Sequence, residues 1–380
     1  MAATVSWEGL RELAAFRAEK GCAVSLYVDL DPHVSPTAGD AHTRVSSLLE
    51  RAAKTLDASR TDLAHDQRLA VNGDLARIRR YFEEEFSRDG AHGLAVFAAG
   101  LDGVWRPLAL TESVPDEIKV NDEFYLTPLV PLVGRGEGAI VVAVGRERGN
   151  LYSLHGGKLV PIADRFEEQP GRHDQGGWSQ ARYQRHIENL AQQHLRDVAD
   201  LVDREVRRRR PAKVVIACAE DVRAEFAELL SSEARSAVVG WVHPEAHAGP
   251  PELLALALPL LERRRAEQEA HAVERWREEA GRNGRAASGW EATLEAASEG
   301  RVELLLYQVG VEHAAWRCPA CGRLALEGGK CPLDGTELER RQEGLDLAVH
   351  QTLAAGGTVC AVSGRRDLEP VGGIGALLRY

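Results

Sequence analysis

The stretch Gln175-Gly176-Gly177-Trp178-Ser179-Gln180-Ala181-Arg182-Tyr183 lies near the middle of the 380-residue chain. Its two adjacent glycines let the backbone adopt positive φ and approach a partner closely, because no Cβ intervenes. Beyond it, apolar positions advance in steps of three and four from Tyr183 to Leu201, which predicts a long amphipathic helix. The stretch therefore indicates a glycine-rich loop, beginning near Glu167, that leads into this helix after Trp178.

The segments on either side of this stretch predict alternating strands and helices. Residues 139–144 and 150–155 precede it, and residues 213–219 follow the long helix; all three are short apolar runs typical of strands. A helix near 222–230 and a strand near 237–242 come next. This alternation predicts an α/β unit around the glycine-rich loop.

The outer segments predict two further α/β domains, each with mixed sheets flanked by helices. The first third contains strands at 23–30, 93–98, 104–109 and 124–133 and helices at 10–18, 41–56 and 61–86. The last third contains helices at 252–279, 290–297 and 345–355 and strands at 302–308, 358–362 and 376–380. Glycine-rich residues 134–138 and the proline-bearing linker 244–251 separate the parts. We expect an N-terminal domain at 1–135, a central domain at 136–250 and a C-terminal domain at 251–380.

Composition and charge restrict the function. Hydrophobic residues make up 44% of the chain and charged residues 28%, and no apolar run approaches the roughly 18 residues that a membrane helix needs. The N-terminus lacks the pattern of a signal peptide, so we expect a cytoplasmic protein with no membrane partner. The net charge of −11 argues against general nucleic-acid binding. Residues 165–213 have the opposite sign of charge, with eleven Arg or Lys and eight Asp or Glu. Any RNA contact should therefore be local.

The C-terminal domain contains a cysteine cluster with metal-ligand spacing. Cys318-Pro319-Ala320-Cys321-Gly322 has the form of a zinc knuckle, and Cys331-Pro332-Leu333-Asp334-Gly335 repeats it with Asp334 in place of the second cysteine. Carboxylate oxygen can bind Zn²⁺, so a structural zinc site of three cysteines and Asp334 is expected, in a small ribbon at about 313–340. His313 is the alternative fourth ligand. Metal-free cysteines are the alternative to a zinc site.

The run from Gly176 to Tyr183, followed by Arg185, resembles the Gly-Gly-Gln loop and downstream helix of archaeal and eukaryotic class-I peptide chain release factors. The order of the flanking strands agrees over about residues 138–245. The ending Gly372-Gly373-Ile374-Gly375 resembles the third domain of the same superfamily. The N-terminal domain matches only loosely and lacks the motifs that read stop codons. The resemblance implies a three-domain release-factor-like architecture with a zinc-ribbon insertion in the C-terminal domain.

One departure from the release-factor pattern bears on the chemistry. Trp178 stands directly after the glycines, where release factors have their catalytic glutamine, and Gln180 comes two residues later. This shifted order is similar to the Vms-type and ankyrin-repeat zinc-finger peptidyl-tRNA hydrolases and their bacterial relatives. The resemblance implies that Gln180, Gly176 and Gly177 form the catalytic loop. The expected RNA contacts are an aromatic platform, a hydroxyl and nearby basic groups, namely Trp178, Ser179, Arg172, His173, Arg182 and Arg185.

The expected function is hydrolysis of the ester of peptidyl-tRNA at the peptidyl-transferase centre, after the protein enters the ribosomal A site, which frees stalled chains without reading a codon. A translational GTPase is a further expected partner. The alternative is a hibernation factor that occupies the A site without chemistry, which Trp178 in the glutamine position favours. A third reading is an RNA-binding adaptor unconnected to ribosomes. Without the flanking pattern, Gly176-Gly177 is an ordinary turn and Gln180 an ordinary residue of the first helical turn.

Overall fold

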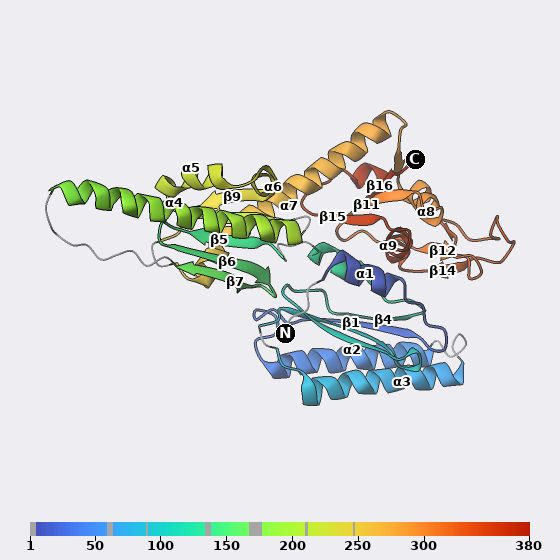
Figure 1. Cartoon of the computed structure of the whole chain (residues 1–380). Coiled ribbons are helices and arrows are strands. Elements are labelled where there is room, and N and C mark those ends of the chain that lie inside the picture. The colour runs from blue at the N-terminus through green and yellow to red at the C-terminus, as the bar shows by residue number, and fades with distance from the viewer. Residues whose placement is uncertain are drawn as a thin grey trace. The chain divides into compact units, whose positions relative to one another are not determined.

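A computed structural model describes residues 5–58, 64–88, 90–133, 138–166, 177–209, 212–245 and 248–380 (Figure 1). The side chains of residues 55, 57, 58, 164–166 and 177–187 lie outside this description. The chain divides into two compact units: unit 1 combines Met1–Gly134 with Gln268–Tyr380, and unit 2 is Arg135–Glu267. The described sheets are flanked by helices, so the predicted α/β class is confirmed. The division into three domains stays a prediction.

The N-terminal part of unit 1 is an antiparallel sheet covered by two helices. Its strands, in the order β3-β2-β1-β4, are β1 (Ala23–Asp29), β2 (Gly93–Ala99), β3 (Val104–Leu110) and β4 (Glu117–Asn121). On one face, Val24, Leu26 and Val28 pack against helices α2 (Ala38–Ala58) and α3 (His65–Arg80), and a π-helical turn (Tyr81–Glu85) continues α3. Because side chains alternate along a strand, Ala23 and Tyr27 point to the opposite face, which is also buried.

The C-terminal part of unit 1 is a mixed sheet with helices on both faces. Its strands, in the order β10-β16-β11-β15, are β10 (Ala286–Ser288), β11 (Val302–Gln308), β15 (Thr358–Val362) and β16 (Ile374–Leu378). Helices α8 (Trp290–Ser298) and α9 (Gly344–Ala354) contribute to the core on one face. On the other face, Val273 and Trp276 of α7 (Pro250–Gly281) pack against Leu306 and Leu377.

The two parts of unit 1 share one core. Tyr27, Phe97 and Phe124 belong to the same buried cluster as Leu305 and Leu353, and α1 (Trp7–Ala14) contributes Leu10 and Leu13 to it.

The predicted strand at 124–133 is wrong: Thr127–Leu132 is a 3₁₀ helix. Pro128 and Pro131 lack the N–H groups that a strand ladder needs, which explains the difference.

Polar contacts join the same two parts. The Asp346 carboxylate accepts hydrogen bonds from the backbone N–H groups of Leu126 and Thr127 and from the Thr127 hydroxyl, each at 2.8 Å. The His350 ring lies 2.6 Å from the carbonyl oxygen of Phe124. Lys119 pairs with Glu343 at 2.9 Å. Although burial alone would lower the pKa of Lys119, Glu343 and Glu117 raise it, so this cation stays charged.

Unit 2 is a five-stranded sheet between two helical layers. Its strands, in the order β7-β6-β5-β8-β9, are β5 (Ile140–Val144), β6 (Arg148–His155), β7 (Lys158–Phe166), β8 (Val214–Ala217) and β9 (Val238–Val242). Strands β5, β8 and β9 are parallel, and β6 and β7 form an antiparallel hairpin. One face carries α4 (Gly177–Arg208), α5 (Glu220–Leu229) and α6 (Ser232–Ala237), and the other carries the first half of α7. Strand β7 was not predicted.

A small sheet in the C-terminal part carries the cysteine cluster. It consists of β12 (Ala315–Arg317) between β13 (Leu324–Ala325) and β14 (Glu339–Arg341). In the described part of the chain, no helix combines the length and apolar character needed to cross a bilayer.

Candidate functional site

The glycine-rich stretch lies at the connection between β7 and α4. Strand β7 ends at Phe166 and helix α4 begins at Gly177, so Gly177 falls in the first helical turn together with Trp178, Ser179 and Gln180. The helix therefore starts slightly earlier than the sequence predicted. Gly176, Arg172 and His173 lie outside the described residues. Arg182 and Arg185 follow in the next turns of α4, and their side chains, like those of residues 178–180, are outside the description.

The register of the sheet places the end of β7 at the edge where β5 also ends. Phe166 at the end of β7 pairs with Arg148, and Gly149 pairs with Val144 at the end of β5. Because β5 and β8 are parallel, Val144 and Ala217 end at the same edge. The first turn of a helix leaves backbone N–H groups without partners inside the helix. The backbone of Gly177–Gln180 can therefore offer donors to an oxyanion or a phosphate.

Helix α4 is fixed on the sheet by its apolar face. Leu195, Val198 and Val202 are fully buried in the core of unit 2. Gly149 of β6 lies directly against Val198: a Cβ at this glycine would sit 2.4 Å from the valine Cγ2. Strand and helix thus meet at a distance that only glycine permits, and the packing sets the position of the whole helix.

Two other groups lie at the same sheet edge. Arg146, after β5, pairs with Asp221 at 3.4 Å and with Glu225 at 3.6 Å. Cys218, after β8, is buried, and burial raises the pKa of its thiol to about 11. Because a thiol with this pKa stays protonated near neutral pH, Cys218 is not an activated nucleophile. Its burial is typical of a cysteine that packs as a small apolar side chain.

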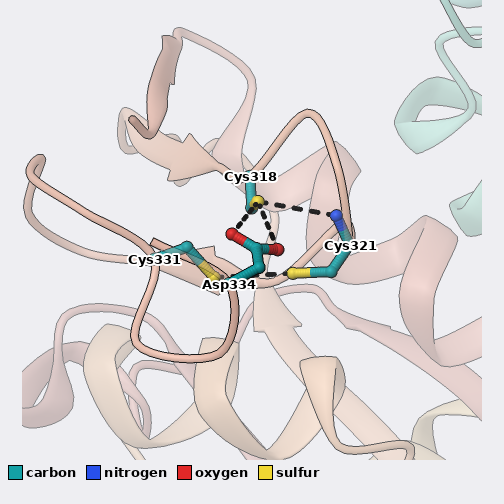
Figure 2. A group of neighbouring side chains, drawn as sticks. All are labelled: Cys318, Cys321, Cys331 and Asp334. Carbon is teal, nitrogen blue, oxygen red and sulfur yellow. Dashed lines mark hydrogen bonds between the residues drawn. The ribbon is translucent and has the colours of Figure 1, made fainter. Parts of the chain in front are cut away.

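The cysteine cluster is brought together as predicted (Figure 2). One ligand atom from each of Cys318, Cys321, Cys331 and Asp334 lies within 4.8 Å of the others. The Cys321 and Cys331 sulfurs are 3.5 Å apart, and the Cys318 sulfur lies 3.4 Å from an Asp334 oxygen. Two sulfurs that bind one tetrahedral zinc ion lie about 3.8 Å apart. The four groups can therefore hold a single metal ion.

Two matching turns shape this cluster. The N–H of Gly322 donates to the carbonyl of Cys318 at 2.9 Å, and the N–H of Gly335 donates to the carbonyl of Cys331 at the same distance. Both glycines have positive φ, 77° and 74°, which side-chain-bearing residues rarely adopt. The repeated Cys-Pro-x-x-Gly sequence thus encodes a repeated turn, with Asp334 where the first turn has Cys321.

A hydrogen bond that the sequence interpretation missed orients Asp334. The backbone N–H of Thr336 donates to the Asp334 carboxylate at 2.9 Å and is the main cause that keeps the pKa of this group well below its usual range. A carboxylate held ionised in this way is a competent metal ligand. Asp-Gly-Thr is a typical sequence for such a turn, and this pattern could have revealed the contact. His313, the alternative ligand, lies outside the cluster, with its ring 5.2 Å from that of Trp290.

Comparisons with known proteins show that the chain, including the glycine-rich segment, is similar to release factors. The model described as "Bacterial archaeo-eukaryotic release factor family 10" matches residues 125–262. Peptide chain release factor subunit 1 of Archaeoglobus fulgidus is 22% identical over 405 residues, which cover 98% of this chain and 96% of the relative. The same subunit of Methanopyrus kandleri is 25% identical over 211 residues, 54% of this chain and 51% of the relative.

Among solved structures, the chain resembles archaeal Pelota from a model of ribosome-bound archaeal Pelota and ABCE1. The identity is 16%, the TM-score is 0.44, and the match covers 75% of this chain and 76% of that chain. The family match spans the β7–α4 connection, and the Archaeoglobus relative aligns over nearly the whole length. The family match and the Archaeoglobus relative support a place for this chain in the release-factor superfamily.

Proposed function

We propose that this protein is a ribosome-associated peptidyl-tRNA hydrolase that frees stalled nascent chains without reading a codon. One observation carries the proposal: the family match covers residues 125–262 and therefore the segment that contains Gly176, Gly177 and Gln180. Peptidyl-tRNA in the ribosome is the proposed substrate. The peptidyl-transferase centre, reached through the A site, is the proposed place of action, and a translational GTPase is the proposed delivery partner.

The proposed chemistry is addition of water to an ester. The water oxygen attacks the ester carbonyl carbon, the resulting oxyanion collapses, and the 3′ oxygen of the tRNA leaves with a proton. Gln180 orients the water through its side-chain amide, and backbone N–H groups of the first turn of α4 stabilise the oxyanion. Gly176 and Gly177 allow close approach to the ester. Trp178 and Ser179, with Arg172, His173, Arg182 and Arg185, contact the surrounding RNA.

Release of peptide from ribosome-bound peptidyl-tRNA tests this proposal. Wild type is compared with Gln180→Ala and with the matched variant Gln184→Ala, which removes the same side chain one turn further along α4. We expect Gln180→Ala to slow release roughly 100-fold or more, the usual cost of losing one such polar group, while Gln184→Ala remains active. Equal rates for the two variants would exclude Gln180 as the catalytic group.

Ribosome binding, measured together with peptide release, distinguishes the hydrolase from a non-catalytic hibernation factor. Trp178 at the usual glutamine position favours this alternative. Cosedimentation with ribosomes is measured alongside release for wild type and Trp178→Ala. A wild-type protein that cosediments but releases no peptide is a hibernation factor rather than a hydrolase. A wild-type protein that does not cosediment contradicts both.

We also propose that the ion held by Cys318, Cys321, Cys331 and Asp334 is Zn²⁺ with a structural role. Three thiolates and one carboxylate are a donor set that suits zinc, and they fill its four tetrahedral positions. Such a closed site has no open position for a substrate. The ion would therefore hold the two turns together and take no part in ester hydrolysis.

A further inference from the structure

The cysteines of the metal cluster differ in their access to solvent. Cys321 is exposed, whereas Cys318 and Cys331 are 0% and 2% exposed. The structure describes all six cysteines of the chain, and Cys321 is the exposed one among them. A small oxidant in solution therefore reaches the sulfur of Cys321 before that of any other cysteine.

The sulfur of Cys321 points toward that of Cys331 (Figure 2). The two atoms lie 3.5 Å apart, so they must approach by about 1.5 Å to reach the length of a disulfide bond. The hydrogen-bond partners of the Cys318 sulfur are instead the Asp334 carboxylate and the backbone N–H of Cys321. Cys331 is therefore better placed than Cys318 to pair with Cys321.

This pair of cysteines connects the two matching turns of the cluster. Cys321 belongs to the turn at residues 318–322 and Cys331 to the turn at residues 331–335. Among the described residues, the hydrogen bonds between the two turns all run through side chains of the cluster. A disulfide between Cys321 and Cys331 would thus replace the connection that a bound metal ion provides.

We infer that Cys321 and Cys331 are a redox-active pair, which a peroxide joins in a disulfide with release of the metal ion. The inference rests on the zinc site proposed above and not on the hydrolase activity. A cysteine that binds zinc is a thiolate, which is also the form that attacks a peroxide. The disulfide removes two of the four donors that a structural zinc ion needs, so the ion leaves.

The reaction moves two electrons from sulfur to the peroxide. The Cys321 thiolate attacks one oxygen of hydrogen peroxide, the O–O bond breaks, and a sulfenic acid and a hydroxide ion form. The Cys331 thiolate then attacks the Cys321 sulfur, so that the S–S bond forms, the S–O bond breaks and a second hydroxide ion leaves. Both hydroxide ions take up protons from the solvent and become water. A dithiol reductant reverses the disulfide.

Peptide mass spectrometry after treatment of the zinc-loaded protein with hydrogen peroxide tests the pair. Remaining thiols are alkylated before digestion, and released zinc is measured with a chromogenic chelator. We expect a Cys321–Cys331 disulfide, an alkylated Cys318 and about one zinc ion released for each disulfide. Dithiothreitol with added zinc should restore the starting protein. Cys360→Ser, which changes a cysteine outside the cluster, is the control and should behave as wild type does.

The melting temperature tests whether the disulfide replaces the metal ion as the connection between the turns. After removal of zinc by a chelator, oxidised wild type should melt roughly 5 °C or more above reduced wild type. Cys331→Ser should show no such increase. Equal melting temperatures of the two wild-type forms would contradict this replacement.

Two results would overturn the inference: a disulfide between Cys318 and Cys321, or release of zinc by peroxide without any disulfide. Elemental analysis before the treatment tests the zinc site separately. Protein that is purified without metal contradicts the zinc site and the release of an ion, while the disulfide mapping still decides whether Cys321 and Cys331 pair. The assay contains neither ribosome nor ester, so its outcome is independent of the proposed hydrolase activity.

Discussion

Asp346 is a buried carboxylate on which three hydrogen-bond donors converge. Its oxygen accepts from Leu126, Thr127 and the Thr127 hydroxyl, and its side chain also lies 3.5 Å from the His350 ring. Burial raises its pKa, while His350 and the donors oppose the shift. The residue joins α9 to the 3₁₀ helix at Thr127–Leu132, and this contact is specific because few other side chains could satisfy all three donors.

Removing the Asp346 carboxylate should destabilise unit 1. Asp346→Ala leaves buried donors without an acceptor, and we expect a loss of about 3–5 kcal/mol in the free energy of unfolding. Asp346→Asn keeps an acceptor oxygen and should cost less. Chemical denaturation of the three proteins measures both effects. Equal stability of wild type and Asp346→Ala would show that the three hydrogen bonds do not support the fold.

The contribution of Asp346 to the stability of unit 1 should depend on pH in a definite direction. Because burial raises the folded-state pKa of Asp346, its stabilising contribution is complete below the unfolded-state pKa and is lost as pH rises through the folded-state pKa. Asp346→Asn does not titrate at this position. Between about pH 4 and about pH 7, wild type should therefore lose free energy of unfolding relative to Asp346→Asn. If the difference in free energy of unfolding between the two proteins is constant across this range, the pKa of Asp346 is not raised in the folded state.

At the scale of elements, the seam between β6 and α4 positions the segment proposed to be catalytic. Gly149→Ala would place a Cβ 2.4 Å from Val198, so strand or helix must move. We expect a loss of about 1–3 kcal/mol in the free energy of unfolding and a lower peptide-release rate. Gly145→Ala is the control, because its nearest neighbour would lie at 3.7 Å. Adding Val198→Ala should recover part of the loss, and thermal melts of the single and double variants would show whether it does.

The cysteine cluster is connected to the N-terminal part of unit 1 through a neighbouring residue. Arg317 on β12 directly precedes Cys318, is buried, and pairs with Glu123 at 2.7 Å. If the cluster holds the proposed zinc ion, Cys318→Ser should lose it, and the melting temperature of unit 1 should fall. Elemental analysis and thermal denaturation would measure both, with Cys360→Ser, a cysteine outside the cluster, as the control. Full metal retention in Cys318→Ser would contradict the assigned ligand set.

Local sequence predicted those elements whose pattern is continuous. Strands β5 and β8 are uninterrupted apolar runs, β1 is apolar except for Ser25 and the terminal Asp29, and the cysteine ligands follow a repeated motif. Strand β7 was missed because Pro161 and charged residues interrupt its pattern, and such a sequence suits the edge position that it occupies. The candidate loop was recognised from its glycines, yet the side chains of residues 177–187 lie outside the description, so their catalytic and RNA-binding roles stay predictions.

At the scale of the whole molecule, unit 1 is built from both ends of the chain. Its shared core could not be predicted from local patterns, because Tyr27 and Phe97 meet Leu305 and Leu353 from segments far apart in sequence. The N-terminal sheet is covered by α2 and α3 on one face and by this core on the other. Neither face is therefore available to a partner while unit 1 stays folded.

This arrangement predicts that the N-terminal and C-terminal parts of unit 1 unfold together and separately from unit 2. His350→Ala removes the contacts of the ring with the carbonyls of Phe124 and Ala14, at 2.6 and 3.4 Å. Amide hydrogen exchange should then accelerate in β1 and β4 as well as in α9, and stay unchanged in unit 2. His194→Ala, at a buried histidine of α4, is the reciprocal variant and should affect unit 2 alone. Exchange that accelerates only in α9 for His350→Ala would show that the two parts are independent domains.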